Sequence, residues 1–502
     1  MYPTVSKFDP LTSAYSRKVN YSIRQFLAQS LLAAALFCTG VSHSQELKLP
    51  NLGESSTSLF SAEQEYKLGR AWGRMFRSQV PTLDDPLVHD YLEDLIYRLA
   101  THSQLQDRRL DLIVVKNQVL NAFAVPGGVI GVHTGLLLYA QTEDELATVL
   151  SHELAHLSQR HFSRGVEQQK KQQPLTYAGM LAGLVLIATT GSSAGLAALS
   201  ASQAAAIDSQ LRFSRSNEQE ADRIGMQTLE EAGMDPHAAP AMFERMLAAS
   251  RYSGGNRVPE FLRTHPLSEN RIADTRNRAR QYPKVLREES LAFHLVRARV
   301  QILHADSPQR AVAEFRSALA GKPLSREASQ YGLVLALKEA GQPVEARSEL
   351  DQLLQHNPDQ VEYLIASAEL DLAIGEAQAA VRALQRELRI YPGNHALTMA
   401  YARALMADNQ AHIAEEVLLA QTRRRPGDPG MWYLLAEVAG LSGNILGLHR
   451  ARAEYFILSG GLSEADKQLK YALKLAQNDY HTSALVNQRI LDVSNMRRSL
   501  DL

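Results

Sequence analysis

The strongest constraint on the fold of this 502-residue chain is a repeat of 34 residues in its second half. Pro358, Pro392 and Pro426 follow one another at this spacing. Three further sets keep it in other registers: Gly341, Gly375, Asn409 and Gly443; Ala346, Ala380 and Ala414; Ala368, Ala402 and Ala436. A unit of this length fits two antiparallel helices, with small residues where helices cross and Gly or Asn at the inner turn. We therefore predict stacked helical pairs over residues 286–485 and a C-terminal tail at 486–502.

The period is similar to that of tetratricopeptide repeats. Trp432 alone occupies the tryptophan position of that repeat, and the pattern decays before Ser307 and after Leu462, as terminal capping repeats do. The resemblance implies an α-helical solenoid wound as a right-handed superhelix. Its concave face would then be a docking surface for other proteins.

The N-terminus has the order of a secretory signal peptide. Basic residues precede an uncharged stretch at 26–41, and the small residues that follow end at Ser44. We therefore predict that residues 1–44 are removed and that the protein is exported. The alternative is an uncleaved membrane anchor, for which the apolar stretch is short. Cys38, the only cysteine, lies inside this segment, so the remaining chain would have no disulfide bond.

Length and charge restrict the remaining possibilities. A chain of 502 residues is too long for one hydrophobic core, so two or three domains are expected. The formal net charge is −1, which provides no basic surface for a nucleic acid. We therefore expect no nucleic acid partner.

The region before the repeats, residues 45–285, combines helical patterns with a short β-rich stretch. Apolar runs at 110–115, 122–125 and 129–132 read as strands, and a Pro-Gly-Gly turn between the last two predicts a β-hairpin. The predicted fold class is mainly α with a small β-sheet, followed by the helical solenoid.

Residues 172–207 carry no charge and are rich in Ala, Gly, Leu and Ser. One interpretation is a transmembrane hairpin, although each half is short for a full span. The other is a helical hairpin that packs against the neighbouring domain or covers its cleft as a lid, since small residues favour close helix packing. A peripheral membrane contact through this segment is also expected.

The sequence His-Glu-Leu-Ala-His at 152–156 carries the chemistry. Thr142 and Glu145 have the spacing of a capping box, which predicts a helix through this motif. His152 and His156 then lie on one helix face, where both imidazoles can bind one Zn²⁺ ion. Glu153 follows the first histidine and is the candidate general base. The alternative is a chance occurrence of the motif on an amphipathic helix.

A third ligand is expected from a helix that starts near residue 217. Glu218 and Asp222 are one turn apart on the same face, whereas Glu220 points away. Glu218 is the predicted zinc ligand, and Asp222 should accept the outer N–H of a ligand histidine and fix its tautomer. The alternative is an acidic helix start in solvent.

Two other histidines are weaker candidates. His265 precedes Pro266 and therefore lies in an extended or turn segment, from which it could become a fourth zinc ligand that closes the site. The alternative is an exposed loop histidine. His161 is five residues past His156, and we expect a packing or capping role for it.

The motifs together resemble the gluzincin family that contains HtpX and the CAAX prenyl proteases, family 48 of the metallopeptidases. Besides the two motifs above, similar segments occur at 121–128, at 159–161, at 264–266 and at 270–272. The resemblance covers about residues 60–280 and implies a zinc endopeptidase with one Zn²⁺ per chain. Convincing membrane spans are lacking, which argues against processing of prenylated proteins.

An unfolded substrate offers backbone groups whatever its sequence, so it should bind as an added strand beside the first strand of the hairpin. The residues of this predicted substrate strand are Asn121, Ala122, Phe123, Ala124 and Val125.

An export signal, this protease and a repeat array together resemble periplasmic proteases of Gram-negative bacteria. The resemblance implies degradation of unfolded or misassembled outer-membrane proteins, with the repeats docked on the outer-membrane β-barrel assembly machinery. The alternative is a chaperone or adaptor whose zinc site is latent. An intact Glu153 favours the enzyme, because a structural zinc site needs no general base.

Overall fold

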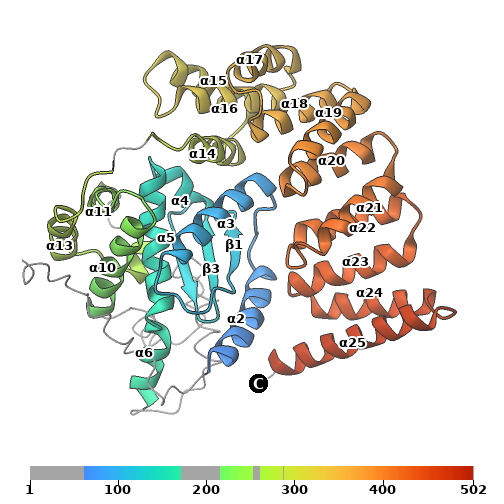
Figure 1. Cartoon of the computed structure of the whole chain (residues 1–502), viewed down its shortest axis with the longest axis horizontal. Helices are drawn as coiled ribbons and strands as arrows, with labels where there is room; N and C mark the ends of the chain where they lie inside the picture. The colour runs from blue at the N-terminus through green and yellow to red at the C-terminus, as the bar shows by residue number, and fades with distance from the viewer. Residues whose placement is uncertain (1–60, 171–214, 253–259, 286–287, 501–502) are drawn as a thin grey trace, which may run out of the picture. The chain divides into compact units, whose positions relative to one another are not determined.

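The computed structural model describes residues 61–170, 215–252, 260–285 and 288–500 (Figure 1). The predicted signal peptide at 1–44 and the uncharged segment at 172–207 lie outside these residues. In the part that is described, no helix combines the length and the hydropathy needed to cross a bilayer. The structure is mainly helical with one small sheet, which confirms the predicted fold class.

The sheet has three strands in the order β1-β3-β2: β1 (Asp111–Val115), β2 (Ala122–Val125) and β3 (Val129–His133). β1 is parallel to β3, and β2 is antiparallel to β3 in the predicted hairpin. Gly127 has a φ of +87°, and a Cβ atom there would lie 2.1 Å from the carbonyl oxygen of Glu65, so only glycine fits this turn. β2 is an edge strand, and its outer edge pairs with no strand among the described residues.

Helices cover both faces of the sheet. Side chains of β1 alternate between two apolar clusters: Ile113 packs with Trp72 and Phe76, whereas Leu112 packs in the larger cluster on the opposite face. Among the described residues before the repeats, the helices are α2 (Ala62–Arg77), α3 (Pro86–Thr101), α4 (Thr134–Tyr139), α5 (Glu143–Ser158), α6 (His161–Lys170), α10 (Arg215–Glu231), α11 (Ala238–Tyr252), α12 (Glu260–Thr264) and α13 (Glu269–Ala279).

Only one half of the predicted capping box forms at the start of α5. The Thr142 hydroxyl accepts a hydrogen bond from the Glu145 N–H at 3.2 Å. The Glu145 carboxylate, however, accepts from the N–H of Gln141 and pairs with Arg245, because a buried carboxylate is stabilised more by a guanidinium than by a second backbone N–H. The helix therefore begins at the predicted position, but the Glu145 carboxylate bonds the N–H of Gln141 and not that of Thr142.

The second half of the chain consists of helical pairs that stack on their neighbours (Figure 1). Gly341, Gly375, Asn409 and Gly443 have φ between +60° and +84° at the turns inside the pairs, and the repeating prolines lie between pairs. The helices are α14 (Leu291–Leu303), α15 (Pro308–Ala320), α16 (Arg326–Glu339), α17 (Pro343–His356), α18 (Val361–Ala373), α19 (Ala377–Ile390), α20 (His395–Ala407), α21 (Ala411–Thr422), α22 (Pro429–Leu441), α23 (Ile445–Leu458), α24 (Leu462–Leu475) and α25 (Tyr480–Leu500).

The ends of the repeat region differ from the expected boundaries. α25 runs through residues 485 and 486 without a break, and its Val486 and Val493 are buried in the last apolar cluster, so this segment is a packed helix and not a separate tail. At the other end, α14 belongs to two cores. Phe293 and Val296 are buried with residues of α3, α4 and α5, whereas Leu295 is buried against the first repeat helices.

Polar contacts also join the repeats to α3. The Arg425 guanidinium, which follows α21, lies 3.2 Å from the Asp90 carboxylate and also contacts Glu93. Arg299 of α14 donates a 2.9 Å hydrogen bond to Asp85, the residue that caps α3. The repeats therefore pack directly on the helix that covers the sheet.

We predict that the region before the repeats requires α14 to fold. Without this helix, the apolar surface that buries Phe293, Val296 and Val300 is exposed, and each such side chain contributes roughly 1.5–3 kcal/mol. A chain ending at residue 306 should therefore melt at a higher temperature, and remain less aggregated, than one ending at residue 285. Both variants lose the α3–α20 contact, so the comparison reports on α14 alone. Equal melting temperatures would contradict the shared core.

Candidate metal centre

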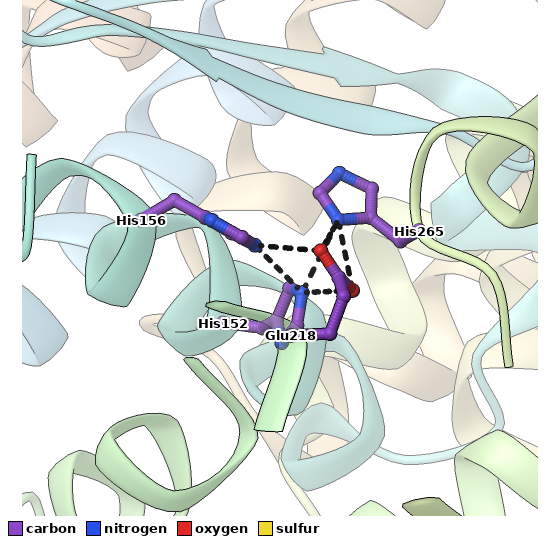
Figure 2. Close-up of side chains that lie close together, drawn as sticks. All are labelled: His152, His156, Glu218 and His265. Carbon is purple, nitrogen blue, oxygen red and sulfur yellow. Dashed lines mark hydrogen bonds and ion pairs between the residues drawn. The ribbon is translucent and has the colours of Figure 1, made fainter. Parts of the chain in front are cut away.

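Helix α5 presents two histidines to one buried point. His152 and His156 are one turn apart, and their Nε2 atoms are 3.1 Å from each other. Both residues are buried, with at most 4% of their surface exposed. Figure 2 shows the two rings converging from the same helix.

Helix α10 brings a carboxylate to the same point. The Glu218 carboxylate lies 3.5 Å from the Nε2 atom of His152 and 3.5 Å from that of His156. Gly225 on α10 faces the backbone of α5, where a Cβ atom would lie only 3.2 Å from the His152 nitrogen. The glycine therefore permits the close approach of the two helices that carry the site.

His265 completes the group from the segment between α12 and α13. Its Nδ1 atom lies 3.4 Å from His152 Nε2 and 3.1 Å from the Glu218 carboxylate (Figure 2). The ring is buried and stacks on Phe261 at a centroid distance of 4.7 Å. Its place is therefore fixed by packing, unlike that of an exposed loop histidine.

These four residues fit a zinc ion. The ligand atoms of His152, His156, Glu218 and His265 all lie within 4.8 Å of one another. Tetrahedral zinc with bonds of 2.0–2.1 Å to nitrogen or oxygen requires ligand atoms about 3.3–3.4 Å apart. The separations of 3.1–3.5 Å agree with that requirement. Imidazole nitrogen and carboxylate oxygen are also the ligand types that zinc prefers.

The electrostatics of the group also favour a bound cation. Burial disfavours the charged form of His152, but hydrogen bonds to Asp222 and Glu218 outweigh it and raise its pKa to about 9. Burial likewise opposes the charge on Glu218, yet the neighbouring His265 and His152 hold its pKa well below the usual range. By contrast, burial and the neighbouring His152 hold the pKa of His156 well below its ordinary value, which favours the neutral imidazole that a metal ion requires.

Asp222 and Arg271 support the ligands from outside. Asp222 Oδ1 lies 3.0 Å from His152 Nδ1, the ring nitrogen that faces away from the other ligands. Arg271 donates two 2.7 Å hydrogen bonds to Asp222 and contacts the Glu218 carboxylate at 2.7 Å. The sequence motif contained Arg271 but gave no role for it. No spacing rule could have found it, because it approaches from α13, 49 residues after Asp222.

Glu153 lies beside the four residues and is not one of them. Its carboxylate is 3.5 Å from His265 Nε2, and the nearby backbone of Ala124 on the edge strand β2 favours its charged form. Burial raises the pKa of this carboxyl above its ordinary value. The structure thus places the candidate base between the metal ligands and the predicted substrate strand.

His161 differs from its expected role. The Nδ1 atom of His161 lies 2.8 Å from Nδ1 of His156, so this residue contacts a ligand histidine instead of only packing or capping. Glu220, predicted to point away from the face of Glu218 and Asp222, is not among the four residues; its carboxylate lies 3.0 Å from His161 Nε2. His161 reaches both side chains because it stands at the start of a new helix, α6, after a sharp turn at Arg160, whose φ is +50°.

Comparison with known proteins gives consistent matches. Residues 86–279 match the model of peptidase family M48. The Beta-barrel assembly-enhancing protease of Escherichia coli is 35% identical over 427 residues, which cover 84% of this chain and 86% of that protein. The protein of the same name from Yersinia pestis is 33% identical, covering 86% and 89%. Mitochondrial metalloendopeptidase OMA1 of Arabidopsis thaliana is 32% identical over 175 residues, 34% of this chain and 32% of that protein.

We predict different effects for two neighbouring substitutions on α5. His152→Ala removes a ligand, so the purified variant should contain far less than one zinc per chain. Glu153→Gln leaves the four-residue group intact and should retain one zinc per chain. Metal analysis by mass spectrometry after dialysis measures both. Full zinc content in a His152→Ala/His156→Ala double variant would refute the assigned ligands.

Proposed function

As a member of peptidase family M48 this chain is a metalloendopeptidase, and we propose that it works with one zinc ion held by His152, His156 and Glu218. The observation that carries the proposal is the convergence of these buried ligand atoms, with their tetrahedral spacing, beside Glu153. Zinc bound there would polarise the scissile carbonyl and lower the pKa of a water molecule.

In this proposal, Glu153 accepts the proton of the attacking water. Burial raises the pKa of this carboxyl, which favours proton acceptance, and the backbone of Ala124 lies beside it. Asp222, held by Arg271, keeps the proton of His152 on Nδ1, so that Nε2 is free to bind the metal. Glu153, Asp222 and Arg271 are each more than nine-tenths buried, so bulk water does not compete for their hydrogen bonds.

Edge strand β2 is the proposed binding site for the substrate backbone. Asn121 accepts a hydrogen bond from the His133 N–H, so Asn121, Phe123 and Val125 direct their backbone groups towards β3. Ala122 and Ala124 therefore face the open edge, on the side of Glu153. A peptide added there reads only backbone groups, which suits a protease that acts on unfolded chains of many sequences.

We further propose a periplasmic location and unfolded or misassembled outer-membrane proteins as substrates. Two things support this: the signal-like N-terminus and the likeness, over most of the chain, to proteins named for β-barrel assembly. The repeat region would then dock on the outer-membrane assembly machinery, because stacked helical pairs leave an extended surface exposed.

A latent state is the second proposal, and the position of His265 favours it. With His265 as a fourth protein ligand, zinc keeps no open position for water. Proteolysis would then require the segment between α12 and α13 to withdraw, and until then the protein would act as a chaperone or adaptor through its repeats. Binding of a substrate or partner could shift this two-state equilibrium.

We expect the purified protein without residues 1–44 to digest casein or an unfolded outer-membrane protein, and to leave the same outer-membrane protein intact once it is folded. A chelator should abolish cleavage, and added zinc should restore it. Glu153→Gln should reduce cleavage by at least about 100-fold, because general bases contribute about 10²–10⁴-fold. Gel-based digestion measures each case. Cleavage that persists in both the chelated enzyme and Glu153→Gln would refute the proposal.

The latent state makes a separate prediction. His265→Ala removes only the fourth ligand, so the variant should keep zinc and cleave casein several-fold faster than the unsubstituted protein. His237→Ala, at a half-exposed histidine paired with Asp235, is a matched control and should change neither property. Unchanged or slower cleavage by zinc-loaded His265→Ala would contradict latency and leave the zinc site itself untouched.

A further inference from the structure

The two metal-binding histidines on α5 have different partners on their outer ring nitrogens. His152 Nδ1 faces the carboxylate of Asp222 at 3.0 Å. His156 Nδ1 faces another imidazole, that of His161, at 2.8 Å. The outer partner of a metal-bound histidine fixes its tautomer and orientation, so this contact bears directly on the metal.

The proton positions along the hydrogen-bonded series His156, His161 and Glu220 follow from its geometry. Nε2 of His156 belongs to the four-residue group, so the proton of a neutral His156 is on Nδ1. That N–H can donate only if Nδ1 of His161 is unprotonated and accepts. The proton of His161 is then on Nε2, where it donates to the Glu220 carboxylate at 3.0 Å.

We propose that His161 is a positioning residue for His156 and that Glu220 holds it in the accepting tautomer. This inference rests on the zinc site proposed above. The neutral His161 imidazole, held by a carboxylate, fixes the tautomer and orientation of His156, as Asp222 does directly for His152. The role adds a third carboxylate from α10 to the site, after Glu218 and Asp222.

The surrounding structure holds the His161 ring in place. His161 is 1% exposed and is the first residue of α6. The turn into α6 passes through Arg160, which pairs with Glu65 of α2 at 2.6 Å, and Ser163 donates to the same carboxylate at 2.6 Å. Glu220 is in turn contacted by Arg164 at 3.3 Å. Three helices therefore set the position of this ring.

A role in packing alone explains these contacts less well. An apolar side chain would fill the same buried space without the desolvation cost of two ring nitrogens. Here Nδ1 of His161 contacts the ligand histidine His156, and Nε2 contacts the carboxylate of Glu220, which is about one-third exposed. The polar chain thus links the metal ligand to a charge near the surface.

Variants of the full protein separate positioning from packing. His161→Leu keeps the bulk and removes the acceptor, so zinc affinity should fall about 10–100-fold, the range for outer partners of metal ligands. His161→Gln can accept from His156 and donate to Glu220, and it should restore most of the affinity. Glu220→Gln removes the charge and should give an intermediate loss. Glu230→Gln, an exposed carboxylate on the same helix, is the matched control and should have no effect.

Two measurements decide the outcome. Competition with a chromophoric chelator gives zinc affinity, and the visible absorption of the Co²⁺-loaded protein reports ligand geometry. The melting temperatures of the zinc-loaded and the metal-free protein separate packing from positioning. A packing defect lowers both melting temperatures equally. Loss of positioning weakens zinc binding and therefore narrows the difference between them. We expect a narrowed difference and an altered Co²⁺ spectrum in His161→Leu.

Zinc affinity within twofold of the unsubstituted protein, in either a folded His161→Leu or Glu220→Gln, would overturn the inference. If His161→Leu does not fold, His161→Gln and Glu220→Gln still decide it, because the proposal requires the first to bind zinc more tightly than the second. Failure of the unsubstituted protein to bind zinc would instead refute the proposed function.

Discussion

The packing of α5 against α10 is the contact on which the rest of the site depends. Burying the imidazoles of α5 or the carboxylates of α10 without partners would cost free energy. When the two helices pack together, these groups become partners of one another. One helix offers two imidazoles, and little more than one turn of the other offers Glu218, Glu220 and Asp222. The close approach at Gly225 brings these groups within hydrogen-bonding distance. The sheet, α13 and α6 then supply outer partners for a centre that these two helices define.

The convergence of His152 and His156 could be predicted from spacing, because i and i+4 positions share a helix face whatever the tertiary fold. Glu218 could be named as a candidate only beside that motif, and its meeting with the two histidines depends on the packing of α10 on α5. Gly341 and its counterparts likewise marked their turns, since positive φ is a local property that Gly and Asn tolerate. These features could be predicted from sequence because the residues that indicate them and the backbone geometry that they favour lie within one turn of the chain.

Other features depend on contacts that no local pattern records. Arg271 reaches Asp222 across 49 residues, and Glu220 turns to His161 only because α6 starts with a new axis after Arg160. The same holds for α14, whose sequence fits the decaying edge of the repeat but whose Phe293 fills a core formed far earlier in the chain. These residues could be placed only once the helices had positions in space.

The helix shared by two cores has a consequence for the fate of the molecule under stress. Loss of the repeats removes α14 from its outer neighbours, and the core beneath the metal ligands then loses part of its own cover. Damage to the first repeats should therefore also lower the stability of the core beneath His152 and His156. The order of the four-residue group is thereby coupled to the integrity of the neighbouring repeats.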